Sequence, residues 1–331
     1  MKEILNYLYD QKTLSRQEAQ EVLKNIAGGK YNHSQIASFI SVYLMRSITI
    51  EELSGFRDAL LDLCIPIRLD GFETIDLCGT GGDSKDTFNI STLATFVVAG
   101  AGAKVAKHGN YGVSSTCGSS NVMEYLGYTF SNDESKLRKE IGETGICFLH
   151  APLFNPAMKN VAPVRKELGV KTFFNMLGPM VNPSFPKKQL VGVYSLELAR
   201  IYNYLYQQTD KDFVIVHSLD GYDEISLTGA FKVIERDSEK IMLPGDLGLN
   251  TFPPGELTGG NSIEEAAGIF MNILEGKGTQ AQNDVVIANA GLGLKAYHPE
   301  KDVPECIELA RDSLESGKAA TSLKKLLELN K

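Results

Sequence analysis

Residues 75–125 read IDLCGTGGDSKDTFNISTLATFVVAGAGAKVAKHGNYGVSSTCGSSNVMEY and place three polar, glycine-containing loops between apolar runs. The first loop, 79–83, follows an apolar run that we expect to be a strand, 74–78. The second loop, 107–110, follows an expected strand at 104–106, and a Ser/Gly loop then leads into a helix. Loops that follow parallel strands open at the same edge of a sheet. We therefore expect all three loops to line one phosphate-rich pocket.

The same alternation of short β-branched runs and helical patterns continues along the rest of the chain. It is typical of an α/β fold with a mostly parallel central sheet, and we assign residues 72–331 to such a domain. The further expected strands are 147–149, 190–194, 213–217 and 285–288, with a peripheral antiparallel excursion from 233–236. The expected helices are 92–101, 121–126, 133–144, 156–168, 262–274 and 303–329.

Residues 1–66 have a different pattern, which predicts a small helical domain of about four short helices. Ser15 and Glu18, and again Thr49 and Glu52, have the spacing of a capping box, in which side chains satisfy the free amides of a first helical turn. A bundle this small needs a partner surface, so we expect it to pack on the second domain or on another subunit. The Pro/Gly-rich segment near 165–185 is expected to cross back to it.

Composition restricts the class of protein further. The chain has 331 residues and a formal net charge of −8, whereas a surface that binds nucleic acid usually needs a basic face. Its five cysteines are scattered and include no CxxC pair, which predicts reduced thiols in a cytoplasm and no zinc site. No signal-peptide pattern or long apolar run is present, so we expect a cytoplasmic protein that does not enter a membrane.

The first two polar segments have the chemistry of an anion site. In the loop GTGGD (79–83), glycines allow backbone amides to approach an anion closely, although a simple tight turn would have the same sequence. The loop matches neither a Walker loop nor a Rossmann fingerprint. NIST (89–92) precedes an apolar helix, and a helix N-terminus favours phosphate through its dipole and free amides. A plain N-cap is the alternative for this second segment.

Other polar residues are candidates for the same pocket. Lys107 and Asn110 lie in the loop that follows the second expected strand and suit a phosphate and a small substrate, respectively, whereas His108 is expected to be structural. The acidic turn 220–224 follows an expected strand, and its carboxylates would suit magnesium when phosphates are bound nearby. An exposed acidic turn is the alternative. Arg165 is either a surface arginine or a bidentate partner for a carboxylate.

Taken together, the motifs resemble the anthranilate phosphoribosyltransferase family. They occur in the order GTGGD, NIST, KHGN, SSxxGS, NPAMKxVxPVRxELG, FFNxLGPxxNP and DEIS, and the resemblance extends over nearly the whole chain. It implies a nucleoside-phosphorylase-like fold that dimerises through the helical domain. It also implies transfer of phosphoribosyl from 5-phosphoribosyl 1-diphosphate to the amine of anthranilate in tryptophan biosynthesis, with two Mg²⁺ ions per subunit and diphosphate as the second product.

The resemblance implies roles for individual residues, with none acting as acid, base or nucleophile. The residues implied in binding phosphoribosyl diphosphate are Gly79, Gly82, Asp83, Thr87, Asn89, Ile90, Ser91, Thr92, Lys107, His108, Gly109, Asn110, Tyr111, Gly112, Val113, Ser114, Ser115 and Ser119. The residues implied in binding anthranilate are Gly79, Asn110 and Arg165, with Asn155 as an additional candidate. The residues implied in binding magnesium are Ser91, Asp223 and Glu224.

The chain departs from the family pattern at a few positions. Asn155 stands where histidine is frequent, Thr116 where lysine is frequent, and Asn121 where aspartate is frequent. Asn155 can still form a hydrogen bond to a substrate but cannot become cationic. Two alternative functions remain, a pyrimidine nucleoside phosphorylase and a non-catalytic relative of the fold that binds nucleic acid. The acidic balance and the Asp223–Glu224 pair argue against the second alternative.

Overall fold

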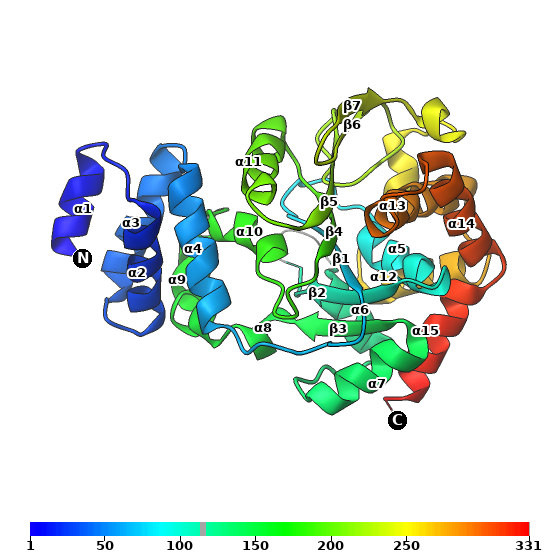
Figure 1. Ribbon diagram of the computed structural model, residues 1–331, viewed down its shortest axis with the longest axis horizontal. Coiled ribbons are helices and arrows are strands. Elements are labelled where there is room, and N and C mark those ends of the chain that lie inside the picture. The colour runs from blue at the N-terminus through cyan, green and yellow to red at the C-terminus, as the bar shows by residue number, and fades with distance from the viewer. Residues whose placement is uncertain (113–116, 331) are drawn as a thin grey trace. The chain divides into compact units, whose positions relative to one another are not determined.

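The computed structural model describes residues 1–112 and 117–330, and its internal contacts divide the chain into two units (Figure 1). The helical unit comprises Met1–Pro66 and Ala151–Pro183. The α/β unit comprises Ile67–His150 and Ser184–Lys331. The segment that returns to the helical unit therefore begins earlier than the expected crossing at 165–185. No helix within the described ranges combines the length and the apolar content needed to span a membrane.

The first stretch of the helical unit contains the short helices that its capping signals predict. They are α1 (Lys2–Tyr9), α2 (Arg16–Ala27), α3 (His33–Met45) and α4 (Ile50–Leu63). Both predicted capping boxes are present, Ser15 with Glu18 before α2 and Thr49 with Glu52 before α4. The second stretch contains α8 (Ala151–Phe154), η1 (Pro156–Asn160), α9 (Ala162–Leu168), α10 (Phe174–Leu177) and η2 (Gly178–Met180). The helix expected at 156–168 is thus two shorter helices that meet at Val161.

Aromatic side chains hold the two stretches of the helical unit together. Phe173, in the returning segment, stacks on Phe56 of α4 with ring centroids 4.6 Å apart. It also meets Tyr43 of α3 edge-on at 5.1 Å. Aromatic pairs in such arrangements stabilise a core beyond the area that they bury. The returning segment is therefore part of the core of the bundle.

The strands of the α/β unit form a sheet in the order β3-β2-β1-β4-β5-β6-β7. They are β1 (Thr74–Gly79), β2 (Lys104–Gly109), β3 (Ile146–His150), β4 (Lys188–Gly192), β5 (Asp212–Ser218), β6 (Phe231–Ile234) and β7 (Glu239–Met242). Neighbours from β3 to β5 pair in parallel, and β6 and β7 add an antiparallel edge. The predicted fold class and the peripheral antiparallel excursion are both confirmed.

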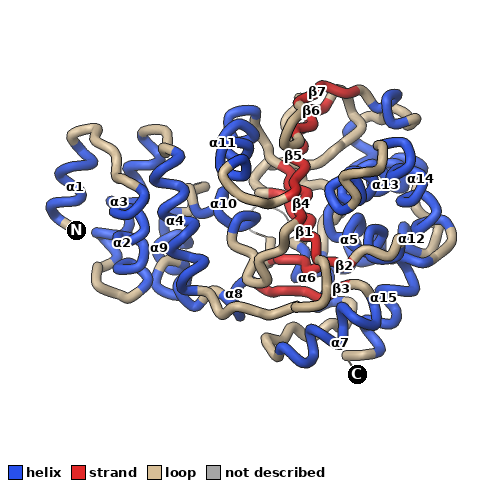
Figure 2. Tube along the Cα trace, in the orientation of Figure 1, coloured by secondary structure: helices blue, strands red, loops and turns tan. Residues whose placement is uncertain are grey.

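Helices cover both faces of this sheet, which appears as a red band in Figure 2 with α5 and α13 on one side and α11 on the other. The helices of the α/β unit are α5 (Ile90–Gly100), α6 (Ser119–Tyr125), α7 (Glu134–Thr144), α11 (Leu196–Gln207), α12 (Ile263–Leu274), α13 (Gln280–Tyr297), α14 (Val303–Glu315) and α15 (Lys318–Glu328), with short turns η3 (Pro244–Leu247) and η4 (Pro254–Leu257). The single helix expected at 303–329 is interrupted at Gly317, whose φ of +78° suits glycine.

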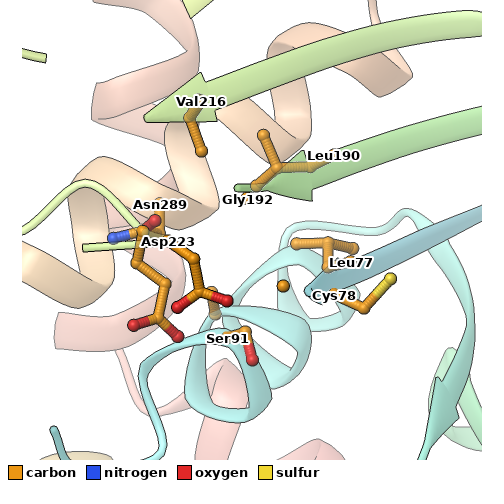
Figure 3. A pocket seen from close by; sticks show the side chains of 11 residues that line it. Leu77, Cys78, Ser91, Leu190, Gly192, Val216, Asp223 and Asn289 are labelled. Carbon is orange, nitrogen blue, oxygen red and sulfur yellow. The ribbon is translucent and has the colours of Figure 1, made fainter. Parts of the chain in front are cut away.

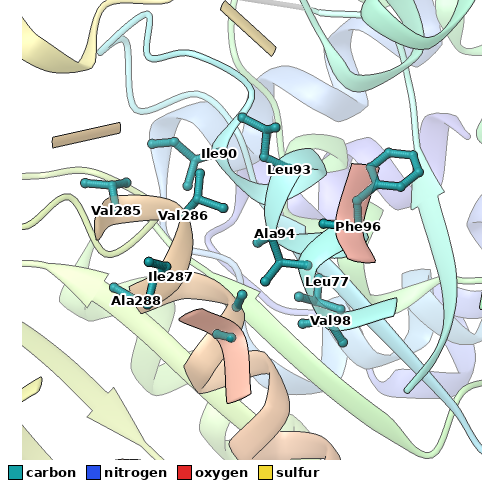
Figure 4. Close-up of a cluster of buried hydrophobic side chains, with 14 of the residues drawn as sticks. Leu77, Ile90, Leu93, Ala94, Phe96, Val98, Val285, Val286, Ile287 and Ala288 are labelled. Carbon is teal, nitrogen blue, oxygen red and sulfur yellow. The ribbon is translucent and has the colours of Figure 1, made fainter. Parts of the chain in front are cut away.

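The strand expected at 285–288 is wrong, because these residues lie inside helix α13. The run VVIA is buried on every side against α5 and β1, as Figure 4 shows for Val285–Ala288, Leu93 and Leu77. A continuous apolar run fits a fully buried helix as well as a buried strand, so periodicity cannot separate the two. Packing is close here, since a Cβ added at Gly293 of α13 would lie 2.7 Å from Leu77 Cδ2. Helix α13 therefore supports the centre of the sheet.

Candidate active site

The carboxyl ends of β1, β4 and β5 meet the acidic turn that follows β5. Figure 3 shows Asp223 beside Ser91 of α5 and close to Cys78 and Gly192, at the ends of β1 and β4. Around them is a cavity of about 10 Å³, which is room for roughly one water molecule. The predicted meeting of the glycine loop, the start of α5 and the acidic turn at one edge of the sheet is therefore present.

The GTGGD loop wraps around the carboxylate of Asp223. Asp223 is only 6% exposed, and its Oδ2 accepts a hydrogen bond of 2.6 Å from the backbone amide of Gly81. A Cβ added at Gly79 would lie 2.4 Å from that Oδ2, and one added at Gly192 would lie 1.6 Å from the carbonyl oxygen of Asp223. Both strand ends therefore need glycine for the acidic turn to reach its position.

Glu224 is held from several directions. Its Oε2 accepts from the hydroxyl of Thr87 at 3.4 Å, and its carboxylate also accepts from the backbone amide of Ser91. Its carbonyl accepts from Ser218 Oγ at 2.7 Å. The next residue, Ile225, donates its amide to Asn289 Oδ1 of α13 at 3.0 Å. Sequence reasoning does not identify Asn289, which directly follows the expected strand at 285–288. The one signal in the sequence is a single amide side chain next to an apolar run.

The acidic turn carries more negative charge than the protein around it neutralises. Burial, and then the charge of Asp83, raises the pKa of Asp223 to about 7. Burial, and then the charges of Asp223 and Asp83, raises the pKa of Glu224 well above its usual range. Carboxylates that are buried and repel one another favour a bound cation, and hard oxygen ligands suit Mg²⁺.

The donor set fits magnesium that is shared with a phosphate ligand. Within residues 1–112 and 117–330 no group of three or more His, Cys, Asp and Glu side chains is placed to hold a metal by itself. Mg²⁺ is commonly bound through one or two carboxylates together with substrate phosphates. Asp223 and Glu224, with the hydroxyl of Ser91, would supply the protein's share of such a site.

The D223N variant is expected to unfold at a higher temperature than the wild type when magnesium is absent and the pH is about 8. Because the folded pKa of Asp223 is about 7 and the ordinary value is 3.8, this carboxyl stabilises the fold at low pH, and its contribution is lost as the pH rises through about 7. An amide avoids that loss and can still accept from Gly81. We expect a gain of a few degrees, at about 2–4 °C per kcal/mol, in scanning calorimetry.

The pH and magnesium dependence serve as the controls for this result. At about pH 6 the difference in melting temperature should be smaller, because Asp223 is then mostly protonated. Magnesium with diphosphate should raise the melting temperature of the wild type more than that of D223N. A lower melting temperature for D223N at both pH values would contradict the assigned repulsion.

The first turn of α5 faces the acidic turn. Asn89 precedes the helix but does not cap it, since its Nδ2 donates instead to the carbonyl of Cys117 at 2.9 Å. The amide of Ile90 donates to the carbonyl of Phe88, and that of Ser91 donates to the carboxylate of Glu224. The dipole of the helix favours negative charge at this end, and Glu224 already supplies part of it. Ile90 and Thr92 are buried, which leaves Ser91 as the first-turn side chain that lines the cavity.

The loop after β2 is tied to the centre of the sheet. Lys107 is 2% exposed, and its ammonium donates to the carbonyl of Leu77 at 2.6 Å, while burial lowers its pKa. The amide of His108 donates to the carboxylate of Asp76 at 3.1 Å. Lys107 thus brings positive charge beneath the acidic turn, and its electrostatic neighbours include Glu224.

Residues 109–112 and 118–121 lie side by side. The carbonyl of Asn110 accepts from Ser119 Oγ and from the amide of Ser120, each at 3.2 Å. The Oδ1 of Asn121 accepts from the amides of Gly112 and Gly118, each at 3.0 Å. Asn121, which departs from the family pattern, therefore fixes the predicted phosphate-binding residues beside it. The predictions for Val113, Ser114 and Ser115, and the departure at Thr116, lie outside the described residues.

Arg165 and Asn155, the expected anthranilate residues far along the chain, belong to the helical unit. Arg165 lies on α9 with its guanidinium 5.4 Å from the ring centre of Phe174, and burial lowers its pKa. Asn155 is 6% exposed, and its Oδ1 is buried with no hydrogen-bond partner within the described part of the chain. A half-buried cation and an unsatisfied buried amide oxygen are both groups that a ligand can satisfy.

The two units of the chain both correspond to domains of one class of glycosyltransferases. The profile of the "Glycosyl transferase family, a/b domain" matches residues 71–320, and that of the "Glycosyl transferase family, helical bundle domain" matches residues 2–64. Within that class, the chain belongs to the anthranilate phosphoribosyltransferase family.

The relatives and the solved structures agree on the family. The anthranilate phosphoribosyltransferase of Flavobacterium psychrophilum is 63% identical over 100% of both chains, and that of Christiangramia forsetii is 62% identical over 100% of this chain and 99% of its own. The structure of the Thermus thermophilus enzyme has a TM-score of 0.91 at 32% identity, covering 98% of each chain. That of the Saccharomyces cerevisiae enzyme in complex with PRPP and Mg has a TM-score of 0.91 at 27% identity, covering 98% of this chain and 96% of its own.

Proposed function

We propose that this enzyme transfers the phosphoribosyl group of 5-phosphoribosyl 1-diphosphate to the amine of anthranilate. The products are N-(5-phosphoribosyl)anthranilate and diphosphate, in tryptophan biosynthesis. One observation carries the proposal: the glycine loop, the start of α5 and the Asp223–Glu224 pair gather at one sheet edge in a chain of this family. Lys107 compensates the charge of Glu224 only in part, since the pKa of Glu224 stays well above its usual range, and magnesium bound with diphosphate would supply further positive charge.

The chemistry needs little from the side chains beyond binding and charge. The bond between C1 of the ribose and the diphosphate oxygen breaks, and diphosphate leaves with the electron pair. The amine nitrogen of anthranilate then forms the new bond to C1 and releases a proton. Since an aromatic amine is uncharged at neutral pH, no general base is needed to expose its lone pair. We therefore assign catalysis to positioning and to stabilisation of the leaving group.

Different residues of the α/β unit would bind different parts of 5-phosphoribosyl 1-diphosphate. We assign Gly79, Gly82 and Asp83 to the diphosphate end, and Thr87 and Asn89 through Thr92 to the phosphoribosyl group. Residues 107–115 and Ser119 would enclose the ribose phosphate. Magnesium, when bound, neutralises the charge that develops on the departing diphosphate. Ser91, Asp223 and Glu224 would hold it, and we expect two ions per subunit with Glu224 shared between them.

The loss of anthranilate fluorescence tests the function. Purified protein should consume anthranilate only when 5-phosphoribosyl 1-diphosphate and Mg²⁺ are both present, and diphosphate should form in equal amount. If the fluorescence does not change with all reactants present, the proposed function is contradicted. Phosphorolysis of thymidine or uridine would instead indicate a nucleoside phosphorylase, and salt-dependent binding of single-stranded DNA a nucleic-acid-binding relative. The comparisons with known proteins favour neither alternative.

The Arg165→Ala variant is expected to raise KM for anthranilate about 10- to 100-fold and to change kcat much less, since a hydrogen bond to a charged group contributes about 1.5–3 kcal/mol. The guanidinium would pair with the carboxylate of anthranilate, which does not react, so the loss should fall mainly on binding. Lys166→Ala, which removes the neighbouring exposed cation of α9, is the matched control. Equal KM values for the two variants would contradict the assignment of Arg165.

We expect the enzyme to act as a homodimer through the helical unit. Helices α1 and α3 border a groove of about 500 Å³, which is lined by Leu8, Tyr9, Ala37, Val42 and Met45 together with the polar residues Gln11, Ser38, Ser41 and Arg46. Met45 is 86% exposed and Tyr9 is 55% exposed, whereas Leu8 and Val42 are buried. Exposed apolar side chains with polar residues around them suit a protein–protein contact. If analytical ultracentrifugation at micromolar concentration gives the mass of a single chain, the dimer is contradicted.

We further expect the enzyme to work in the cytoplasm, and fractionation of cells would test this.

A further inference from the structure

The guanidinium of Arg165 is held without a carboxylate. Among the described residues no Asp or Glu forms an ion pair with it, and its side-chain hydrogen bond goes from Nη2 to Oδ1 of Asn175 at 3.3 Å. The ring of Phe174 lies on another side, 5.4 Å away. An arginine stays protonated at any working pH. Neutral groups therefore hold the guanidinium of Arg165 in place, and no described carboxylate neutralises its positive charge.

The oxygen that contacts Arg165 is itself fixed. Oδ1 of Asn175 also accepts from the backbone amide of Thr172 at 3.0 Å, across the start of α10. The neighbouring ring of Phe174 stacks on Phe173 at 4.4 Å, and Phe173 belongs to the aromatic core of the helical unit. A side chain that is immobilised by packing and by a second hydrogen bond fixes the position of its hydrogen-bond donor more closely than a mobile side chain does. Asn175 is thus a rigid acceptor for one edge of the guanidinium.

We propose that Asn175 is a specificity-determining positioning residue, which orients Arg165 through a neutral oxygen and so reserves its charge for an anionic group of the acceptor. The inference rests on the proposed function, in which Arg165 binds anthranilate. An aspartate at position 175 would have nearly the same shape but would form an ion pair with Arg165. The guanidinium would then already be neutralised when the acceptor arrives, and an anionic acceptor would also meet a like charge.

The proposal defines the class of acceptor. It predicts selection of an aromatic amine that carries an anionic substituent over a neutral compound of the same shape. Anthranilamide is such a compound, since it replaces the carboxylate of anthranilate with a neutral amide. A site that pairs a charge discriminates strongly against an analogue that lacks it. The ratio of kcat/KM for anthranilate to kcat/KM for anthranilamide therefore measures how strongly the unneutralised charge of Arg165 favours the anionic acceptor.

The experiment compares the wild type with Asn175→Asp and Asn175→Ser at saturating 5-phosphoribosyl 1-diphosphate and magnesium. For N175D, kcat/KM for anthranilate should fall at least tenfold, while kcat/KM for anthranilamide should change less than threefold. The ratio of the two values should therefore fall more than about threefold. For N175S, which cannot reach Arg165 or Thr172 with the same oxygen, KM for anthranilate should rise several-fold with kcat little changed. KM for 5-phosphoribosyl 1-diphosphate should stay constant in both variants.

The outcomes separate this inference from the proposed function. A folded N175D variant whose ratio stays within twofold of the wild type would overturn the role of Asn175. If N175D does not fold, an unchanged KM for anthranilate in N175S would overturn it instead. Equal losses for both acceptors would also overturn it, because they indicate a general structural role. A wild type that consumes no anthranilate at all would refute the proposed function before any variant is compared.

Discussion

The Glu224→Gln variant is expected to lose about 10²–10³-fold in kcat, the loss typical of removing one group that stabilises charge in a transition state. Glutamine has nearly the same shape and can still accept from Thr87 and from the amide of Ser91. It removes the negative charge that would hold magnesium next to the departing diphosphate. Initial rates of anthranilate consumption, measured over a range of magnesium concentrations, give the loss directly.

The neighbouring carboxylate Asp220 provides the matched control for Glu224. It lies in the same acidic turn but is exposed, and its carboxylate accepts from the hydroxyl of Thr228. Asp220→Asn should therefore keep a rate within about twofold of the wild type, as expected for a surface substitution. If E224Q retained most of the wild-type rate at limiting magnesium, Glu224 would have no part in binding the metal.

The Gly192→Ala variant is expected to lower kcat/KM by about 100-fold or more, because a misplacement of about 1 Å can cost that much. The added Cβ would lie 1.6 Å from the carbonyl oxygen of Asp223, so the acidic turn must move away from the end of β4. No flexible side chain can absorb the contact, since the neighbouring atom belongs to the backbone. Affinity for 5-phosphoribosyl 1-diphosphate, measured by calorimetry with magnesium, should fall along with the rate.

Gly229→Ala is the control for this substitution. A Cβ added at Gly229 meets no atom within 4 Å, although the residue lies in the same unit and shortly before β6. Full activity is expected for that variant. A fully active G192A variant would mean that activity does not require the acidic turn to lie against the end of β4.

The parallel part of the sheet could be predicted because each of its strands is a short β-branched run that ends at a polar loop. Strands β1 to β5 were all expected near their observed positions, and the loops after β1 and β2 were recognised from their glycines. The failure at 285–288 has a physical reason, since burial on every side removes the periodicity that separates a helix from a strand. Because the helix was not expected at 285–288, Asn289 of α13 could not be placed next to the acidic turn, which it supports.

Sequence reasoning names Asn121 only as a departure from the family pattern and does not name Asn175. Each of the two accepts two hydrogen bonds with one amide oxygen, one from the residue three positions earlier and one from a more distant residue. The more distant bond cannot be read from a local pattern. The chemistry of a lone Asn depends on what the fold brings next to it. By contrast, the motifs indicated Asp223 and Gly79 correctly as neighbours at one site, because strand order fixes which loops meet at the edge of the sheet.

We expect the edge formed by the glycine loop, the start of α5 and the acidic turn to bind magnesium together with 5-phosphoribosyl 1-diphosphate. Crystals grown with that substrate and Mn²⁺ in place of Mg²⁺ test it most directly, since manganese is located by its anomalous scattering. We expect a manganese peak within about 2.3 Å of a carboxylate oxygen of Glu224 and next to the diphosphate. If diphosphate is bound and no manganese lies at Asp223 or Glu224, these residues do not hold the metal.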